Sequence, residues 1–403
     1  MTSSIPVEAP QEKQVRFSIF SYGFRPFFLA AGIYAILPLI PWALHLAGLY
    51  HADLALQSWH AHEMLFGFVA AGINGFLLTA IPGWTNTPPL TGRKLQQLFC
   101  LWLVGRIAFW LFLFIDHALI GYLLFLDLLL PIAQSMRMIR IFKATKHKRI
   151  LMLTCIMLVL AAANLLIILD LNGFTIGTAQ IGAILAPNML MIMIAAIGGQ
   201  LTPAFTRTYL QQKGLATAVR TIPSIEKLAI ALLVVHALAD LVLPHSVLVY
   251  GIALLACLIH AVRFSRWGTV HVLNQPILWV LHGAYLWLIL ALFLKGAAFM
   301  LDLPAHSYLH AFTIGAVGLY MTGIMTRAGL GHTGRPLIVH SLISNAYRLV
   351  IIAAILRLIA IFVPGYAWQA MMVAIICWVV AFMLYLWVYS PILTRPRVDG
   401  KAG

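Results

Sequence analysis

Twelve stretches of mainly apolar residues follow one another along this chain, and they constrain its fold more than any other feature. A transmembrane α-helix needs about 20 consecutive apolar residues to cross the hydrocarbon core of a bilayer. Only 9% of the residues are charged, whereas soluble domains carry about 25%, so lipid must cover most of the surface. The sequence therefore predicts an all-α integral membrane protein with about twelve transmembrane helices. The predicted spans are residues 26–48, 57–81, 96–115, 118–142, 150–169, 176–200, 225–243, 246–264, 276–300, 306–326, 338–363 and 366–390.

Lysine and arginine occur at alternate connections between these spans, and the remaining connections carry neither. By the positive-inside rule, this pattern places both termini in the cytoplasm. We therefore expect a cytoplasmic tail at 1–25, a single twelve-helix domain at 26–392 and a cytoplasmic tail at 393–403, in an inner membrane. The connections expected outside carry or adjoin aspartates instead: Asp53, Asp116, Asp170, Asp240 and Asp302.

The net charge of +15 follows from this asymmetry of insertion. No nucleic-acid-binding motif accompanies it, so we expect lipid and no nucleic acid as partner. The first 20 residues contain no apolar segment of the kind found in a cleavable signal peptide. Each of the four cysteines lies in a different apolar stretch without a CxxC pair, which predicts buried small side chains rather than a thiolate site.

Similar features recur in the second, sixth and tenth spans. Spans 2 and 10 both open with His-Ala, at His60 and His310, and both are followed by Thr-Gly-Arg, ending at Arg93 and Arg335. Span 6 ends in Pro203, as span 2 ends near Pro82. A recurrence every four spans favours three four-helix units whose second helices face a common interior.

Ionisable side chains inside a membrane span are costly and usually face the bundle interior. The run Trp59-His60-Ala61-His62-Glu63 lies at the outer end of span 2. His60 and Glu63 share a helix face, whereas His62 lies about two thirds of a turn from His60, so the two histidines cannot reach one centre from a regular helix. At the outer end of span 10, His306 and His310 share a face. These four histidines are candidate metal ligands, with Glu63 as a ligand, an orienting group or a proton donor.

A second layer of histidines lies toward the inner side. His282 is placed about 9 Å inside span 9, and His332 follows span 10. Histidine is the usual ligand of haem iron and of copper, so both are candidate ligands. Arg327 and Arg335 lie near them in sequence and suit haem propionates, because a guanidinium fork matches a carboxylate.

Simpler interpretations compete with these. A histidine at the membrane interface is often only a hydrated polar side chain, and Glu63 can serve as a structural hydrogen-bond partner of a histidine. Any haem would be b-type, because no CxxCH motif exists. Walker, GxSxG and HExxH motifs are absent as well.

At these residues the sequence resembles the NnrS family of bacterial membrane proteins. The resemblance covers nearly the whole chain. The matching stretches are Gly23–Phe28, Trp59–Met64, His282, His310–Arg327 and Gly331–Pro336. It implies a twelve-helix protein of the bacterial inner membrane that contains haem and copper and is linked to nitric oxide metabolism and protection from nitrosative stress.

A looser similarity is architectural. Haem-copper oxidases and their nitric oxide reductase relatives also have twelve core helices in three four-helix arcs, with haem ligands on the second and tenth. This sequence has Ala186-Pro187-Asn188-Met189 in span 6 where an oxidase has His-Pro-Glu-Val-Tyr, and it has no His-His pair in span 7. The oxidase binuclear centre is therefore not expected here, and fold alone does not imply function.

Three functions fit these observations. The first is a haem b enzyme, with copper or a second haem, that reduces nitric oxide to N2O or otherwise detoxifies it, using protons from Glu63 and electrons from a quinol or a small redox protein. The second is a haem/copper protein that binds nitric oxide without turnover. The third is a twelve-helix transporter of a solute or metal, in which the histidines are structural and Pro82 and Pro203 break two spans.

Overall fold

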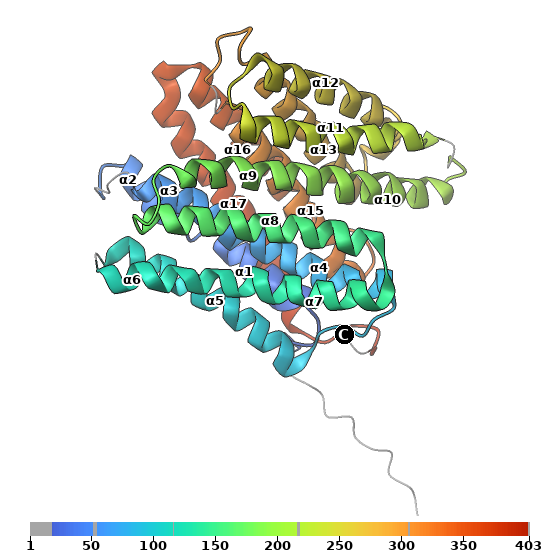
Figure 1. Ribbon diagram of the computed structural model, residues 1–403. Coiled ribbons are helices and arrows are strands. Elements are labelled where there is room, and N and C mark those ends of the chain that lie inside the picture. The colour runs from blue at the N-terminus through green and yellow to red at the C-terminus, as the bar shows by residue number, and fades with distance from the viewer. Residues whose placement is uncertain (1–17, 51–54, 116, 216–217, 305–306, 402–403) are drawn as a thin grey trace, which may run out of the picture.

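The computed structural model describes residues 18–50, 55–115, 117–215, 218–304 and 307–401, and this part of the chain folds into a helical bundle (Figure 1). Its helices are α1 (Phe24–Tyr34), α2 (Leu39–Leu46), α3 (Ala55–His62), η1 (Glu63–Val69), α4 (Ala70–Thr85), α5 (Gly92–Phe114), α6 (Ala118–Leu123), η2 (Leu124–Leu128), α7 (Leu129–Thr145), α8 (Lys148–Leu171), α9 (Thr178–Met193), η3 (Ile194–Gly198), α10 (Gly199–Gln211), α11 (Pro223–Val242), α12 (Val247–Phe264), η5 (Thr269–Val272), α13 (Pro276–Ala297), α14 (Ser307–His310), η6 (Ala311–Gly318), α15 (Leu319–Gly331), α16 (Ser341–Phe362), η7 (Pro364–Tyr366) and α17 (Ala367–Thr394).

The predicted all-α membrane fold is confirmed. Within the described residues, 11 helical segments are long and apolar enough to cross a membrane. A further 20-residue helix, α11, takes the place of the predicted seventh span. It carries Glu226, Lys227 and Asp240, and two of these three charges make ion pairs, that of Asp240 buried and that of Glu226 partly buried. The fold therefore has about twelve spans, as the sequence predicted.

Prolines lie within two of the spans; the helix breaks at one of them and continues through the other. The first span breaks between α1 and α2 because Pro38 has no N–H to donate to the carbonyl of Tyr34, four residues earlier. The predicted sixth span, at 176–200, is too short, since the helix continues through Pro203 to Gln211. Membrane bundles tolerate proline within a helix because neighbouring helices satisfy the freed backbone groups.

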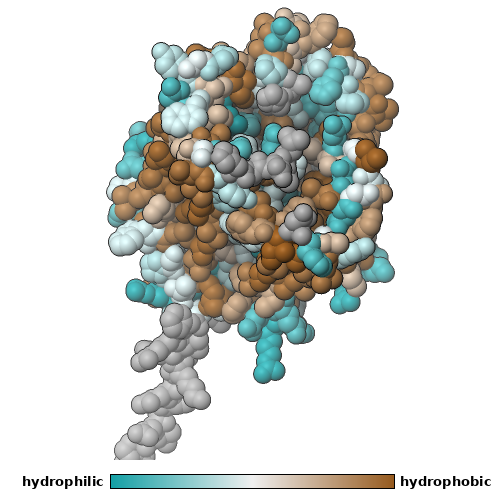
Figure 2. All heavy atoms as spheres, turned by 90° about the vertical axis from the view of Figure 1, so that its left-hand side faces the viewer, coloured by the Kyte–Doolittle hydropathy of each residue, from teal (hydrophilic) through white to brown (hydrophobic). Residues whose placement is uncertain are grey.

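The helix ends form two faces of the bundle. The basic face, on the right in Figure 1, contains the described parts of residues 18–23, 86–91, 146–147, 212–222, 265–275, 332–340 and 395–401. The opposite face, on the left, contains residues 47–50, 172–177, 243–246, 298–304 and 363–366. Figure 2 views the opposite face, where both apolar and hydrophilic side chains lie at the surface.

The second, sixth and tenth spans form the interior of the bundle. Buried residues make up 72%, 72% and 67% of an apolar 18-residue window in these spans and 67% in the ninth span, Pro276–Ala297, compared with 28% in the spans Val247–Phe264 and Ser341–Phe362. Each of the three also contains one π-helical segment, namely η1, η3 and η6. Such segments are rare and frequently mark functional sites. Their recurrence every four spans agrees with the predicted arrangement of three four-helix units.

Candidate functional site

Four ionisable side chains meet inside the first half of the bundle, and we call them the Glu63 cluster: His62, Glu63, Arg106 and Asp127. They come from α3, η1, α5 and η2, and none is more than 3% exposed. The guanidinium of Arg106 joins the two acids, donating from Nη1 to Glu63 and from Nη2 to Asp127. Glu63 is the first residue of the π-helical segment η1, about 12 Å along its span from Ala55.

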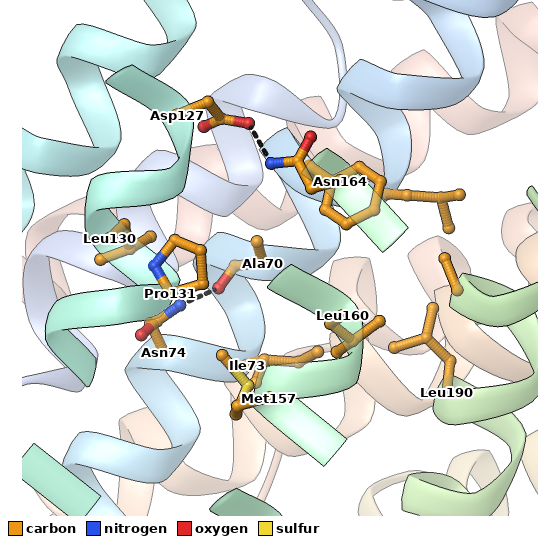
Figure 3. Close-up of a pocket in the computed structure, with 13 residues that line it drawn as sticks. Ala70, Ile73, Asn74, Asp127, Leu130, Pro131, Met157, Leu160, Asn164 and Leu190 are labelled. Atoms are coloured by element: carbon orange, nitrogen blue, oxygen red, sulfur yellow. Dashed lines mark hydrogen bonds between the residues drawn. The ribbon is translucent and has the colours of Figure 1, made fainter. Parts of the chain in front are cut away.

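His62 closes the cluster into a ring. Its Nε2 lies 2.8 Å from Oδ1 of Asn164, and its Nδ1 lies 3.0 Å from Oε1 of Glu63. The amide of Asn164 donates to Asp127 at 2.8 Å, as Figure 3 shows. The imidazole stacks on Phe109 with 3.6 Å between ring centroids. Both ring nitrogens of His62 are therefore engaged by protein atoms.

The hydrogen-bond pattern places one proton between His62 and Glu63. Because the Nδ2 amide of Asn164 donates to Asp127, its Oδ1 must accept, and His62 Nε2 must carry a hydrogen. An ionised carboxylate only accepts, so the contact of His62 Nδ1 with Glu63 needs a further hydrogen, either on the ring or on the acid. The pair thus holds one proton more than a neutral imidazole beside a carboxylate.

The charge count leads to the same result. Two ionised carboxylates and one guanidinium would leave a net negative charge in the membrane interior, which is costly unless it is compensated. One proton on the His62–Glu63 pair makes the cluster neutral. The Tyr34 hydroxyl donates to the second oxygen of Glu63 and accepts from the Trp110 indole at 2.9 Å, which fixes the carboxyl group from the other side.

A small cavity adjoins the acid side of this cluster. Its volume is about 30 Å³, and its lining includes Asp127, Asn164 and Asn74 (Figure 3). Asn74 donates to the Ala70 carbonyl at 2.8 Å, and its buried Oδ1 has no hydrogen-bond partner among the described residues. A cavity above about 10–15 Å³ with polar walls can hold a water molecule. There is therefore room for water between Asn74 and the cluster.

An apolar cavity of about 70 Å³ lies where the three π-containing spans meet α1. Gly72 and Gly198 make room for it, and the side chains of Met321 and Tyr320 lie against these two glycines. Its lining is Phe28, Gly72, Ile73, Phe76, Met193, Ile194, Ile197, Gly198, Leu201, Tyr320, Met321, Ile324 and Met325. Ile73 also lines the small cavity beside Asp127, so the two cavities share this residue.

A second buried ionic group lies in the other half of the bundle. Lys295 donates to Asp240 at 2.5 Å and to the Tyr308 hydroxyl at 3.2 Å. Asn188 donates to Asp240 at 2.9 Å, and its Oδ1 lies 3.1 Å from Nδ1 of His236. We call these five residues the Asp240 cluster. The sequence placed Asp240 beside an outer connection, but the structure buries it because Lys295 compensates its charge.

A further ion pair supports the π-helical segment of the sixth span. Arg263 binds Glu226 and donates to the Tyr285 hydroxyl at 2.8 Å and to the Ala195 carbonyl, within η3, at 2.7 Å. A π-helical turn displaces carbonyls from regular helix bonding, and this arginine satisfies one of them. Tyr285 also contacts His260 at 2.6 Å.

The predicted histidine ligands lie apart from one another. As the helix geometry predicted, His60 points elsewhere than His62, with its ring 5.2 Å from that of Trp42. His282 sits between the hydroxyls of Thr206 and Thr269, each 2.8 Å from one ring nitrogen. His310 ends α14 and is half-buried, and His306 lies outside the described residues.

The remaining predicted residues lie at or near the basic face. His332 is exposed and stacks on Tyr22 at 5.9 Å between ring centroids. Arg327 lies over the Phe205 ring at 3.8 Å, and Arg335 is half-buried. Within the ranges that the structure describes, no group of three or more His, Cys, Asp or Glu side chains is arranged to hold a metal ion.

These contacts test which histidines could hold a haem. His62 and His282 do not fit in this arrangement, because all four of their ring nitrogens have protein partners. His60 fits better: one ring nitrogen bonds the Pro38 carbonyl, while its buried Nδ1 has no hydrogen-bond partner among the described residues. The large hollows, of about 450 and 620 Å³, have no histidine in their lining.

Sequence reasoning found Glu63 and His62 but missed the residues that bind them. The missed residues are Arg106, Asp127, Tyr34 and Asn164, which lie on other elements than Glu63. The available signal was the presence of both charge signs in spans 2, 3 and 4, since an arginine within a span requires an acidic partner.

One family model, described as NnrS protein, matches residues 18–397 of the chain. No curated protein sequence matches it.

Proposed function

Since this chain belongs to the NnrS family, which is linked to nitric oxide responses, we propose that it binds nitric oxide inside the membrane and reduces it to N2O. Joining two NO molecules to N2O consumes two electrons and two protons and releases one water. The electrons would come from a membrane quinol or a small redox protein. The protons would come through the Glu63 cluster.

The observation that carries this proposal is the buried 3.0 Å contact between His62 Nδ1 and Glu63 Oε1, from which we infer a shared proton. A general acid must hold a proton near neutral pH and be able to give it up. The Glu63 cluster meets both requirements, because its neutrality depends on a proton that two adjacent groups share. Water in the cavity beside Asp127 and Asn74 would replace the proton after transfer.

The apolar cavity supports nitric oxide as the substrate. NO is a small, uncharged diatomic molecule that dissolves in hydrocarbon, and apolar cavities of this kind stay dry and bind small apolar ligands. Its volume of about 70 Å³ suits a molecule of that size. Ile73 lines both this cavity and the one beside Asp127, so NO held there would lie near the proposed proton source.

We further propose haem b as the cofactor, which either His60 or His310, at the opposite-face ends of spans 2 and 10, would hold. Haem iron supplies a centre that binds NO and passes electrons to it. A second haem or a copper ion near His282 and His332 would require His282 to release Thr206 and Thr269. Arg327 and Arg335 would serve only such a second site, because they lie toward the basic face.

The test uses full-length protein purified in detergent. Its optical spectrum is recorded as isolated, reduced with dithionite and exposed to NO, and NO consumption is then followed with an electrode under reducing conditions. The proposal expects a Soret band that shifts in both steps, together with NO consumption.

Two other outcomes favour other functions. Haem-loaded protein that never consumes NO would favour binding without turnover. A featureless spectrum from folded protein, not restored by added haem, would favour transport.

The matched variants are Glu63→Gln and Glu226→Gln, which remove one acid each from two arginine ion pairs, the first buried and the second partly buried. We expect the first to keep the NO-induced spectral shift and lose turnover, and the second to keep both. Equal turnover in both variants would rule out Glu63 as the proton donor.

A further inference from the structure

Three segments that are distant in the sequence meet at the basic face. They are the start of α1, the residues after α15 and the C-terminal segment after α17. Backbone bonds join them, from Ser18 to Thr394 at 2.9 Å and from Val398 to Thr333 at 3.2 Å. This junction is therefore a built part of the fold and not a loose tail.

Four arginines gather at this junction, and we call them the arginine cluster: Arg25, Arg335, Arg395 and Arg397. Arg25 is fully buried and donates to the Leu393 and Arg395 carbonyls at 2.9 and 2.7 Å. It lies within electrostatic range of Arg335 and Arg397, and Arg395 lies within range of Arg335. Arg397 donates to the His332 carbonyl at 2.8 Å.

The charges of this cluster are not balanced by the described residues around it. Asp399 is its one acidic neighbour in the described ranges, and Arg397 binds both its carboxylate oxygens, at 2.8 and 2.6 Å. These bonds hold the pKa of Asp399 below its usual range, so it is ionised at neutral pH. Among the described residues, the positive charges of Arg335, Arg395 and Arg397 therefore face one negative charge. Glu8 and Glu12 lie outside the described residues.

The side chain of Arg335 indicates which kind of ligand the positive charge of this cluster would bind. Its Nη1 is buried and has no hydrogen-bond partner in the described part of the chain. The planar guanidinium fork matches phosphate oxygens, and basic pockets between helices at the cytoplasmic side of a membrane bind phospholipid head groups. The sequence places this face in the cytoplasm, where the leaflet is anionic.

We propose that the arginine cluster, where α1, the segment after α15 and the C-terminal segment meet, binds a phosphate group, most simply the head group of an anionic phospholipid. A free phosphate anion has the same chemistry and is distinguished below. The bound phosphate would tie both chain ends to the tenth span, because Arg25, Arg335 and Arg395 belong to these three segments. This site is independent of the nitric oxide chemistry proposed above.

The test is native mass spectrometry of the full-length protein in detergent, titrated with dioleoylphosphatidylglycerol and, for comparison, with the zwitterionic dioleoylphosphatidylcholine. We expect one tightly bound phosphatidylglycerol in preference to phosphatidylcholine. Arg335→Gln should weaken its binding about fivefold, since one basic residue near a membrane surface contributes about that much. The buried Nη1 of Arg335 has no hydrogen-bond partner among the described residues, so the variant breaks no bond of that atom and the fold should persist.

Two further variants sharpen the test. Arg93→Gln removes an exposed arginine from the same face at the start of α5 and should leave binding unchanged. Asp399→Asn removes the competing carboxylate and should strengthen binding.

Inorganic phosphate that displaces the lipid at millimolar concentration would identify the free anion as an alternative occupant, and a failure to displace it would restrict the site to lipid. Equal affinity for both lipids without any effect of phosphate, or equal losses in the Arg93 and Arg335 variants, would overturn the proposal.

Discussion

The Glu63 cluster and the Asp240 cluster are built on the same plan. In each, a histidine bonds the Oδ1 of an asparagine, the asparagine amide donates to an aspartate, and a cation binds that aspartate. The cation is Arg106 in one and Lys295 in the other. The two clusters differ in one additional acid, Glu63, which is present only in the first.

Because of this additional acid, only the Glu63 cluster needs a further proton to be neutral. Lys295 and Asp240 balance each other, so the Asp240 cluster is neutral without an additional proton and needs no explanation beyond packing. The Glu63 cluster is neutral only when His62 and Glu63 hold a proton. A group that must hold a proton inside a membrane is a candidate for proton transfer, and a balanced pair is not.

The largest effect should come from Arg106→Met. Removal of the guanidinium leaves Glu63 and Asp127 as two buried acids without their cation, and breaking a buried pair in this way costs about 3–5 kcal/mol. We expect a large loss of folded protein, measured by thermal unfolding in detergent. Adding Glu63→Gln to this variant should recover part of the stability, because Asp127 can then pair with a protonated His62. A double variant as unstable as the single one would contradict the charge count.

Lys295→Met should destabilise the protein by an amount in the same range, since it leaves Asp240 unpaired. In the Asp240 cluster, replacing both partners should restore nearly all of the lost stability. Replacing both partners, as in Lys295→Met with Asp240→Leu, removes the pair as a unit, and such replacements are often neutral. The measurement is the same unfolding curve for the two single variants and the double variant. If the double variant stays as unstable as either single one, Asp240 has a role that its ion pair does not explain.

Glu63→Gln should affect function far more than stability. The amide keeps the shape of the side chain and leaves Arg106 balanced by Asp127, so the unfolding temperature should fall much less than in Arg106→Met. Loss of a general acid typically slows a reaction by about 10²–10⁴-fold. We expect a decrease of this size in NO consumption, with Asp170→Asn, at the opposite face, as a control near the wild-type rate. A large loss of stability would show that Glu63 is mainly structural.

The smallest effect should separate Tyr34→Phe from Tyr308→Phe. Tyr34 donates to Glu63 and accepts from Trp110, so its loss removes a hydrogen bond to a charged group, worth about 1.5–3 kcal/mol. Tyr308 lies 3.2 Å from Lys295, which still binds Asp240 when the hydroxyl is removed. Unfolding curves should therefore show a greater loss for Tyr34→Phe. A greater loss of stability for Tyr308→Phe would show that the Tyr308 hydroxyl stabilises the fold more than the Tyr34 hydroxyl does, contrary to this prediction.

The fold could be predicted because long apolar stretches have few other solutions in a membrane. The end of the sixth span could not, since Pro203 and Arg207 suggest a break, whereas neighbouring helices let the helix continue to Gln211. The opposed directions of His60 and His62 followed from helix geometry alone. The partners of Glu63 did not, because Arg106, Asp127 and Asn164 come from other helices, and no periodicity within one span determines which helices pack together.

The most direct test of the central claim is the infrared difference spectrum between the wild-type protein and Glu63→Gln at neutral pH. If His62 and Glu63 share a proton, the variant should lose either a protonated-carboxyl band or a histidinium band. Loss of a carboxylate band alone, with the histidine bands unchanged, would show that Glu63 is ionised beside a neutral His62 and would contradict the account.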